Sequence, residues 1–193
     1  MNVMQISFSG LKENILYGNK AISAVKRDFP NGIKSNTYYD TFEKEQDIQK
    51  KLELEDGIER TRDRIDDMVR YGYPEKDAVE MVVKETGFAN CGEQAVLVSI
   101  KLDKEGIVNK IVQMDICRAG KGYHYVTGGH TFCLVGASDN MAVQDPETWG
   151  DEAVVVDMWS GIVQKASEAL KFFSGFVVPK KDEHIEFFNK IYY

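Results

Sequence analysis

Cys91 has the surroundings that a nucleophilic thiol needs. Asn90 is a good helix N-cap, and Glu93 stands three residues after it, where its side chain can close a capping box. The pattern predicts that a helix begins at Cys91, where unpaired N–H groups and the helix dipole stabilise a thiolate and lower the pKa of the thiol. Gly92 leaves room for a carbonyl group beside the sulfur. A free cysteine is often a small buried apolar residue, but a polar first turn suits that role badly.

A nucleophilic cysteine needs a base, and the chain has three histidines. His184 lies in a charged segment near the C-terminus, where we expect an exposed helix. His124 stands among turn-prone residues, which is compatible with a structural role. His130 follows two glycines and begins the apolar stretch Thr131–Gly136, which predicts a strand that holds the imidazole rigidly at its first residue. We favour His130 as the base, with His124 as the alternative.

Two carboxylates compete to orient the imidazole through its second nitrogen. Asp157 ends the apolar stretch Ala153–Val156, and burying a carboxylate there is costly unless it has a partner such as His130. Asp145 stands before Pro146, a dipeptide that is typical of the start of a turn. Asp157 could equally cap the loop that follows it. We favour Asp157, and the sequence leaves Asp145 open.

The order of these residues resembles that of the papain-like and transglutaminase-like cysteine enzymes. Three stretches carry the resemblance: NCGEQA at Asn90–Ala95, GGHTFCLVG at Gly128–Gly136 and VVVDMWSG at Val154–Gly161. The last stretch is similar to the Asp-Pro-Trp-x-Gly box of bacterial effector and toxin members, with Met158 in place of proline. The likeness is one of short motifs and covers Gly87–Gly161, under half of the chain.

The resemblance implies an activity and a role for each residue. Such relatives are peptidases, glutamine deamidases and acyltransferases that modify host proteins. By resemblance, Cys91 is the nucleophile, His130 the base and Asp157 the residue that orients the base. A triad with Asp145 would look more like the transglutaminase pattern, in which Asp-Pro closely follows the histidine. The implied fold is a papain/transglutaminase-like core, in which the nucleophile helix packs on an antiparallel sheet.

The oxyanion site departs from the papain pattern. Papain relatives place a glutamine several residues before the cysteine and an aromatic residue just after it. Glu85 and Gly92 occupy those places here. The oxyanion site would therefore depend on the backbone N–H of Cys91 and on one further donor, for which Asn90 and Gln94 are the candidates.

The sequence pattern of the first half of the chain predicts helices. Apolar residues recur at helical spacing over Glu13–Phe29 and along Asp40–Arg70, where Gly57 predicts a kink or a break. A third helix is expected over Pro74–Lys84. We assign residues 1–86 to a helical region of the same globule.

The second half predicts a helix, an antiparallel sheet and two terminal helices. The expected strands are Lys110–Cys117, His130–Gly136, Ala153–Trp159 and a short one at Met141–Gln144. The expected helices are Gln94–Leu102, Val163–Phe173 and Asp182–Tyr192. This order is typical of the α+β class, and we assign residues 87–193 to a catalytic core with C-terminal helices.

Charge and hydropathy argue against several classes of partner. The formal net charge of −7 disfavours nucleic acid, which needs clustered Lys and Arg, and suggests a basic substrate or partner. No apolar run is long enough for a membrane span. Residues Met1–Gly10 lack the basic start and apolar stretch of a Sec signal peptide. The oligomeric state is not fixed by the sequence.

The cysteines indicate a reducing compartment, such as the bacterial cytoplasm. Cys91, Cys117 and Cys133 are too few and too scattered for a disulfide framework. Delivery into a host cell follows only from the resemblance to effectors. No metal site is expected, because His130 and Cys133 stand three apart on a strand and so face opposite sides. No other cofactor is expected.

Two functions follow from these residues. The first is acyl chemistry on a protein or peptide amide through a thioester at Cys91, resolved by water in a peptidase or deamidase and by an amine in a transglutaminase. The second is a catalytically silent papain-like module that binds a protein through its helical N-terminal half. Two departures from the family pattern favour the second function: Met158 replaces the proline of the Asp-Pro-Trp-x-Gly box, and no glutamine stands at the papain position before Cys91. The target protein and the organism are not identified by the sequence.

Overall fold

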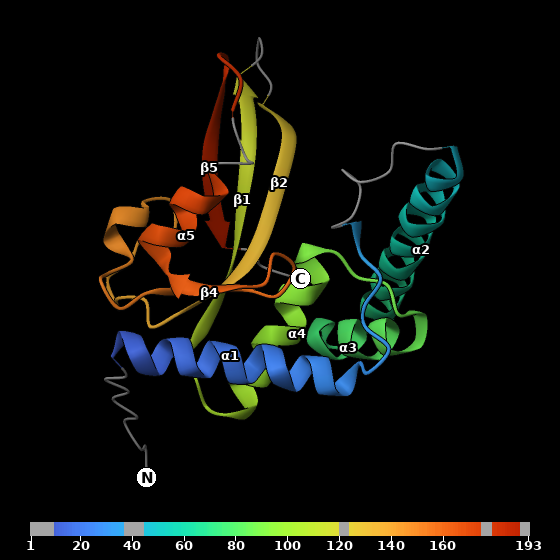
Figure 1. Cartoon of the computed structure of the whole chain (residues 1–193), viewed down its shortest axis with the longest axis horizontal. Coiled ribbons are helices and arrows are strands. Elements are labelled where there is room, and N and C mark those ends of the chain that lie inside the picture. The colour runs from blue at the N-terminus through green and yellow to red at the C-terminus, as the bar shows by residue number, and fades with distance from the viewer. Residues whose placement is uncertain (1–9, 37–44, 120–123, 175–178, 190–193) are drawn as a thin grey trace.

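The computed structural model of the chain describes residues 10–36, 45–119, 124–174 and 179–189 (Figure 1). Helices dominate the first half and strands the second, which is the α+β content that the sequence predicts. In chain order the elements are α1 (Leu11–Asp28), α2 (Glu45–Arg70), α3 (Glu75–Thr86), α4 (Cys91–Lys104), β1 (Asn109–Ala119), β2 (His124–Val135), the short 3-10 helix η2 (Pro146–Thr148), β3 (Val154–Asp157), β4 (Ile162–Lys165), α5 (Ala166–Phe173) and β5 (Glu183–Asn189).

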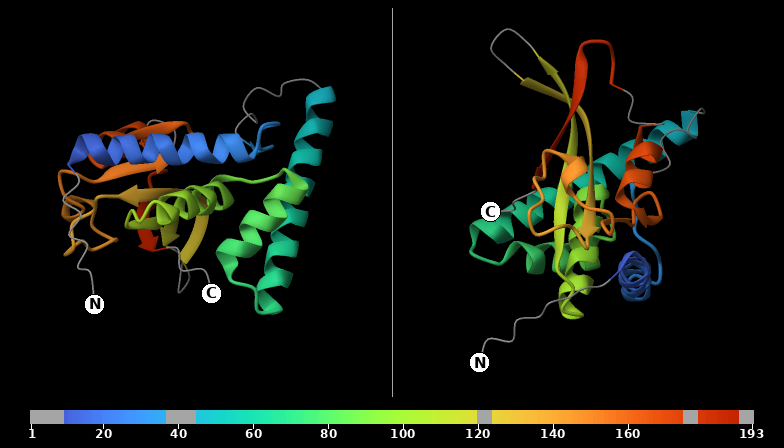
Figure 2. Two further views of the ribbon diagram at one scale, coloured as in Figure 1. Left: turned by 90° about the horizontal axis from the view of Figure 1, so that it is seen from below. Right: turned by 90° about the vertical axis from the view of Figure 1, so that its left-hand side faces the viewer.

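The described strands form an antiparallel sheet in the spatial order β4-β3-β2-β1-β5. β1, β2 and β5 reach beyond the helices as a long ribbon, seen at the top of Figure 1 and in the right-hand view of Figure 2. β3 is much shorter and pairs with β2 only from Cys133 to Val135. The part of β2 that precedes Cys133 therefore has no β3 backbone beside it, and its edge is open to other groups.

Different elements cover the two faces of the sheet. Val154 and Val156 of β3 pack with α1, α3 and α4, whereas Val155 packs with α5 and with the segment around Trp149. Successive side chains of a strand point to opposite faces, so a strand covered on both sides is apolar at nearly every position.

The helix that begins at Cys91 is the centre of the molecule. α4 contacts β1, β2 and β3 as well as α1 and α3, and its side chains from Gly92 to Ile100 are all buried. Other elements therefore enclose this part of α4 on every side, including its polar residues Glu93, Gln94 and Ser99. Val25 of α1 and Val82 of α3 lie in the same buried cluster as Val98 of α4, so the N-terminal helices share one core with the sheet.

The three helices expected in the first half are confirmed, with shifted ends. α1, α2 and α3 correspond to Glu13–Phe29, Asp40–Arg70 and Pro74–Lys84, and residues 40–44 of the second lie outside the described chain. Of the two expectations for Gly57, the break into two helices is wrong, because α2 runs through Gly57 as one helix. A Cβ at Gly57 would overlap the ring of Phe88, so this glycine allows α2 to approach the segment before α4.

Three strands of the second half are confirmed. β1, β2 and β3 cover most of Lys110–Cys117, His130–Gly136 and Ala153–Trp159. β2 begins earlier than expected, so His130 lies inside the strand rather than at its first residue. Its backbone is held opposite Met114 of β1.

The expected C-terminal helix over Asp182–Tyr192 is wrong, because Glu183–Asn189 forms β5 beside β1. Ile185 and Phe187, two residues apart, both pack against the buried cluster around Trp149. That spacing suits a strand, and pairing with β1 outweighs the local helical propensity. The last residues of the expected helix lie outside the described chain.

Two further expectations for the second half are corrected. The expected helix Val163–Phe173 begins only after β4, because a turn at Gly161, with a φ of 76°, returns the chain along β3 as a strand. The expected strand Met141–Gln144 is a series of turns instead. Carbonyl groups of this segment accept hydrogen bonds from the indole N–H of Trp149, so the segment wraps around a buried ring.

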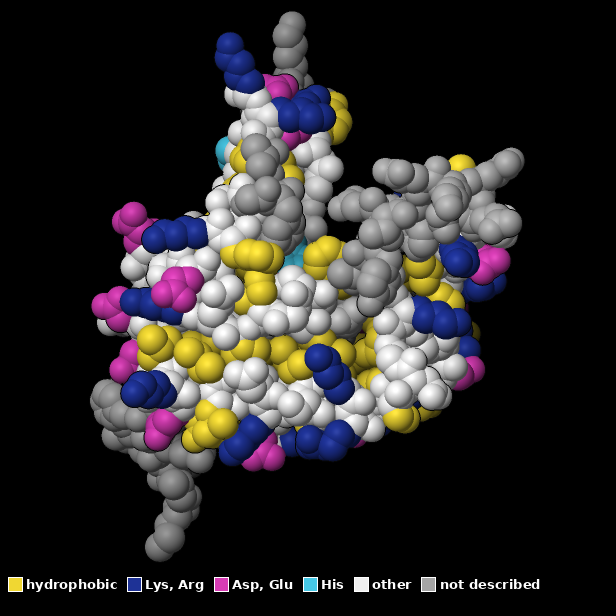
Figure 3. All heavy atoms as spheres, viewed as in Figure 1, with side chains coloured by type: hydrophobic (Ala, Val, Ile, Leu, Met, Phe, Trp, Pro, Cys, Tyr) yellow, Lys and Arg dark blue, Asp and Glu magenta, His cyan; other side chains and the backbone are white. Residues whose placement is uncertain are grey.

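None of the described helices is long and apolar enough to cross a membrane. On the face shown in Figure 3, Lys and Arg side chains are dispersed among Asp and Glu side chains. This face therefore offers no continuous basic stripe to a phosphate backbone.

Candidate active site

Cys91 begins α4, and the capping box predicted from the sequence is confirmed. The Glu93 carboxylate accepts a hydrogen bond from the backbone N–H of Asn90 at 2.8 Å, and the Asn90 side chain accepts one from the backbone N–H of Glu93. The first turn is fixed in this way, with the positive end of the helix dipole at the sulfur. Cys91 is partly exposed whereas Cys117 and Cys133 are buried, so Cys91 is the cysteine that a substrate can reach.

The thiol of Cys91 meets β2 at the open edge of that strand. The side chain of His130 hydrogen-bonds the thiol, and the backbone N–H of Thr131 donates a second hydrogen bond to the sulfur. Both residues precede Cys133, where the pairing of β2 with β3 starts. The start of α4 therefore occupies the place beside β2 that β3 leaves free.

His130 lies between Cys91 and Asp157. Its Nε2 is 2.7 Å from Asp157 Oδ2, which leaves Nδ1 for the thiol. The two side chains are almost fully buried, with exposed fractions of 4% for His130 and 2% for Asp157. The structure thus brings together the three residues that the sequence singles out, from α4, β2 and β3.

The Asp157 carboxylate is held from several sides. Its Oδ1 accepts hydrogen bonds from the backbone N–H groups of Trp159 at 3.0 Å and Ser160 at 3.3 Å. Its Oδ2 accepts one from the Ser160 hydroxyl and faces the imidazole of His130. These donors offset the cost of burying a carboxylate and fix its direction toward the ring.

Three aromatic rings surround the imidazole of His130. The ring centroids of Trp159 and Phe173 each lie 5.1 Å from the His130 centroid, and that of Phe132 lies 6.3 Å away. The rings exclude water from the hydrogen bond between His130 and Asp157, which strengthens it.

Asn36 connects this aromatic cover to the cap of α4. Its Oδ1 accepts a hydrogen bond from the indole N–H of Trp159 at 3.1 Å, and its backbone N–H donates to Asn90 Oδ1 at 3.1 Å. The ring beside the imidazole and the cap beside the thiol are therefore fixed by one residue.

The surroundings shift two pKa values in the directions that favour an ion pair. Burial opposes charge on the Cys91 thiol, but His130 and the Thr131 N–H outweigh burial and lower its pKa. Burial likewise opposes charge on His130, but the hydrogen bonds to Asp157 and Cys91 raise its pKa to about 9. Both shifts favour a thiolate on Cys91 and an imidazolium on His130. Burial raises the pKa of Cys133, whose thiol donates to the Ala95 carbonyl at 3.0 Å.

The structure places the alternative residues away from this pair. Asp145 is exposed and caps η2. His184 is exposed on β5, not on a helix as expected. His124 begins β2, at the opposite end of the ribbon from the strand's pairing with β3, and the side chain of His124 is not described.

The two expected oxyanion donors differ in position. The carboxamide of Gln94 donates to the Ala89 carbonyl at 3.1 Å and faces a different pocket from the one that Cys91 lines. The side-chain oxygen of Asn90 serves the helix cap, whereas its N–H₂ group donates no hydrogen bond within the described chain. Within the described chain, the amide donor of Gln94 is therefore committed to the Ala89 carbonyl, whereas that of Asn90 is not.

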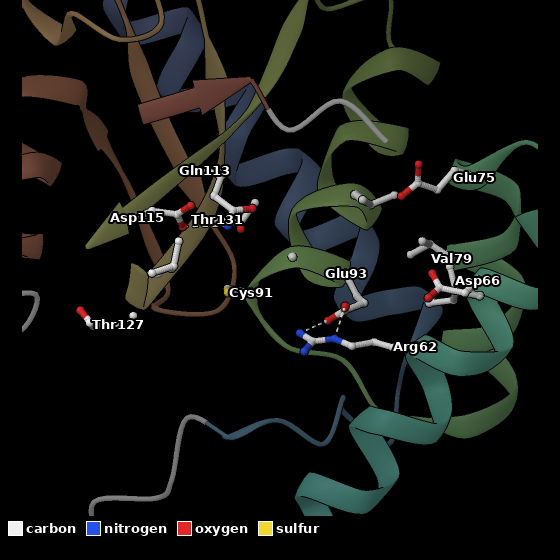
Figure 4. A pocket seen from close by; sticks show the side chains of 16 residues that line it. Arg62, Asp66, Glu75, Val79, Cys91, Glu93, Gln113, Asp115, Thr127 and Thr131 are labelled. Atoms are coloured by element: carbon white, nitrogen blue, oxygen red, sulfur yellow. Dashed lines mark hydrogen bonds and ion pairs between the residues drawn. The ribbon is translucent and has the colours of Figure 1, made fainter. Parts of the chain in front are cut away.

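Arg62 of α2 supports the cap of α4 from outside. Its Nε donates to Glu93 Oε1 at 2.9 Å (Figure 4). Burial would raise the pKa of Glu93, but Arg62 and the Asn90 N–H hold it below its ordinary value. The charge of Glu93 works against a thiolate at Cys91, so the guanidinium of Arg62 protects the thiolate indirectly.

Replacing Arg62 with alanine is expected to slow the reaction of Cys91 with iodoacetamide at neutral pH by roughly twofold to fivefold, because the uncompensated Glu93 raises the pKa of the thiol. Arg64→Ala is the matched control, since Arg64 lies on the same helix and pairs with exposed Glu85 at 2.6 Å. Equal slowing in both variants would contradict this role for Arg62.

Cys91 opens onto a pocket of about 580 Å³. α2 and α3 form one wall, the first turn of α4 forms the base, and β1 and β2 form the other wall (Figure 4). Such a volume is within the range of small-molecule and side-chain sites.

Sequence reasoning missed the supporting roles of Asn36, Thr131 and Ser160. Thr131 and Ser160 stand beside residues that the motifs single out, but their bonds depend on the open strand edge and on the turn after β3. Asn36 carries no local signal, because it meets Asn90 across 54 positions of the chain.

Comparison of the chain with protein-family models, curated proteins and solved structures finds no match. Within the described part of the chain, no group of three His, Cys, Asp or Glu side chains could hold a metal ion.

Proposed function

We propose that the protein is a cysteine-dependent enzyme that acts on an amide of a protein or peptide. Cys91 is the nucleophile, His130 is the acid and base, and Asp157 is a positioning residue. One observation carries the proposal: buried His130 contacts the Cys91 thiol and the Asp157 carboxylate at the same time. A cysteine that only fills space needs neither partner. A helix bearing the thiol, docked on an antiparallel sheet, also supports a papain/transglutaminase-like core.

In the first half of the reaction, the Cys91 sulfur attacks the carbonyl carbon of the amide. A C–S bond forms, and the carbonyl oxygen becomes an oxyanion that the N–H groups at the start of α4 and the Asn90 side chain receive. The imidazolium of His130 then gives its proton to the leaving nitrogen. The C–N bond breaks and a thioester remains on Cys91.

In the second half, His130 takes a proton from water as the water oxygen attacks the thioester. A C–O bond forms, the C–S bond breaks, and the Cys91 thiolate returns. Hydrolysis of a backbone amide is peptidase action, and hydrolysis of a glutamine side chain is deamidation with release of ammonia. We propose one of these two outcomes. An amine in place of water would give a crosslink.

Mass spectrometry of protein and peptide mixtures incubated with the purified chain tests the proposal. New chain termini would identify a peptidase, conversion of glutamine to glutamate a deamidase, and new isopeptide bonds a transglutaminase. Each change must disappear with Cys91→Ala. The proposal of a cysteine-dependent enzyme would be contradicted if the products persisted in this variant or if no product formed in any cell extract. Either result would favour a module that binds proteins through its N-terminal helices.

A further inference from the structure

The pocket beside Cys91 is acidic. Its charged lining consists of four carboxylates and one guanidinium: Asp66, Glu75, Glu93, Asp115 and Arg62. The guanidinium of Arg62 is bound to Glu93, so it does not neutralise the other three. Charges of one sign on the walls of a concave site focus their field into it and attract the opposite charge.

Asp115 of β1 is the most buried of these carboxylates, with an exposed fraction of 7%. Its Oδ1 accepts a hydrogen bond from the Gln113 amide at 2.8 Å. Within the described chain, no Lys or Arg pairs with Asp115. A buried carboxylate whose partner is a neutral amide is costly, and a cation that enters the pocket would reduce that cost.

Gly129 pairs with Asp115 across the ribbon and, because it has no side chain, leaves room for the Asp115 carboxylate. A Cβ at Gly129 would come within 2.5 Å of Asp115 Oδ1. The glycine therefore keeps the wall open where the carboxylate lies. Figure 4 shows Asp115, Gln113 and Thr131 together on the ribbon side of the pocket, with Cys91 between them and the helices.

Asp115 and the Cys91 sulfur lie beside residues of β2 that stand two apart in the strand. Thr131, whose N–H bonds the Cys91 sulfur, follows Gly129 by two residues on β2. Two residues of a strand span about 7 Å, and their side chains point to the same face. A Lys or Arg side chain beside an amide at Cys91 has this reach.

We propose that the pocket selects substrates that carry a Lys or Arg side chain next to the reacting amide, and that Asp115 receives the cation. The identity of the reacting atom rests on the proposed function, but the charge of the pocket does not. A glutamate in this position would be repelled, and an apolar side chain would leave Asp115 without a cation.

Three chloromethyl ketones test this selection: those of blocked lysine, of norleucine, which lacks only the ammonium group, and of glutamate. The Cys91 thiolate attacks the methylene carbon, a C–S bond forms and chloride leaves. Labelling of Cys91 is followed by peptide mass spectrometry, and each rate is divided by the rate with iodoacetamide. The lysine probe should label at least about tenfold faster than the norleucine probe, and the glutamate probe should be the slowest. Added salt should reduce the preference.

Asp115→Asn keeps the shape and the bond to Gln113 but removes the charge. The preference for lysine should fall at least about fivefold in this variant. Asp151→Asn should preserve the preference, because that carboxylate is 97% exposed and pairs with Lys165 outside the pocket. Equal normalised rates for lysine and norleucine in the wild-type protein would overturn the inference, whether or not Asp115→Asn folds.

The two proposals fail separately in this experiment. The pH dependence of the iodoacetamide rate reports whether Cys91 is activated, whereas the ratio between probes reports the pocket even for an ordinary thiol at alkaline pH. An activated Cys91 without a lysine preference overturns only the selection by Asp115. A lysine preference at an unactivated Cys91 supports the pocket and overturns the proposed function.

Discussion

Replacing His130 with alanine should raise the pKa of Cys91 toward that of an ordinary thiol and abolish turnover. The variant loses the hydrogen bond and the positive charge that lower the thiol pKa, while burial, which raises it, remains. It also loses the group that protonates the leaving nitrogen. The combined loss in turnover should be at least about a thousandfold. Alkylation of Cys91 across a pH series measures the first effect, and turnover of a substrate measures the second.

His184→Ala is the control for this prediction, because it removes an exposed imidazole on β5. It should leave the pKa of Cys91 and turnover unchanged. Thermal unfolding of both variants separates loss of chemistry from loss of fold. An unchanged Cys91 pKa in a folded His130→Ala protein would mean that the imidazole does not activate the thiol.

Asp157 variants should separate a catalytic loss from a structural one. Asp157→Asn keeps an oxygen for the turn after β3 but no longer supports a cation on His130, so the pKa of His130 should fall below about 9. Turnover should drop by roughly a hundredfold to ten-thousandfold, as expected when the orienting carboxylate is neutralised. Titration of the imidazole by NMR measures the pKa directly.

Asp157→Ala should also destabilise the fold. It leaves the backbone N–H groups of Trp159 and Ser160 and the His130 ring without their acceptor, at a cost of about 2–5 kcal/mol in the free energy of unfolding. Asp145→Asn is the matched control for both variants, because that carboxylate caps an exposed turn. If Asp145→Asn lowered turnover as much as Asp157→Asn, the assignment of Asp157 would be wrong.

The residues with strong local signals could be predicted from the sequence. The helix start at Cys91 follows from a cap and a glutamate three residues apart, a pattern decided within one turn. Asp157 stands out because a charge that closes an apolar strand needs a partner. Which residue is that partner depends on the tertiary structure, but the chain has only three histidines that could fill the role.

Other parts of the site depend on contacts between distant segments. Asn36 joins Trp159 to the cap of α4, and nothing near Asn36 in the sequence signals this. The charge of the pocket arises where α2 and α3 face β1, so its carboxylates are scattered along the chain. The charged segment that forms β5 predicts an exposed helix, whereas pairing with β1 decides its conformation.

The pH dependence of iodoacetamide alkylation at Cys91, with Cys117 and Cys133 as internal references, tests the thiolate–imidazolium pair most directly. The rate at Cys91 should rise at a lower pH than the rate of an ordinary thiol, with a second change near pH 9 as His130 loses its proton. The two buried cysteines should react only when the protein unfolds. A Cys91 that titrates like an ordinary thiol, or that reacts only on unfolding, would contradict the proposal that this protein is a cysteine-dependent enzyme.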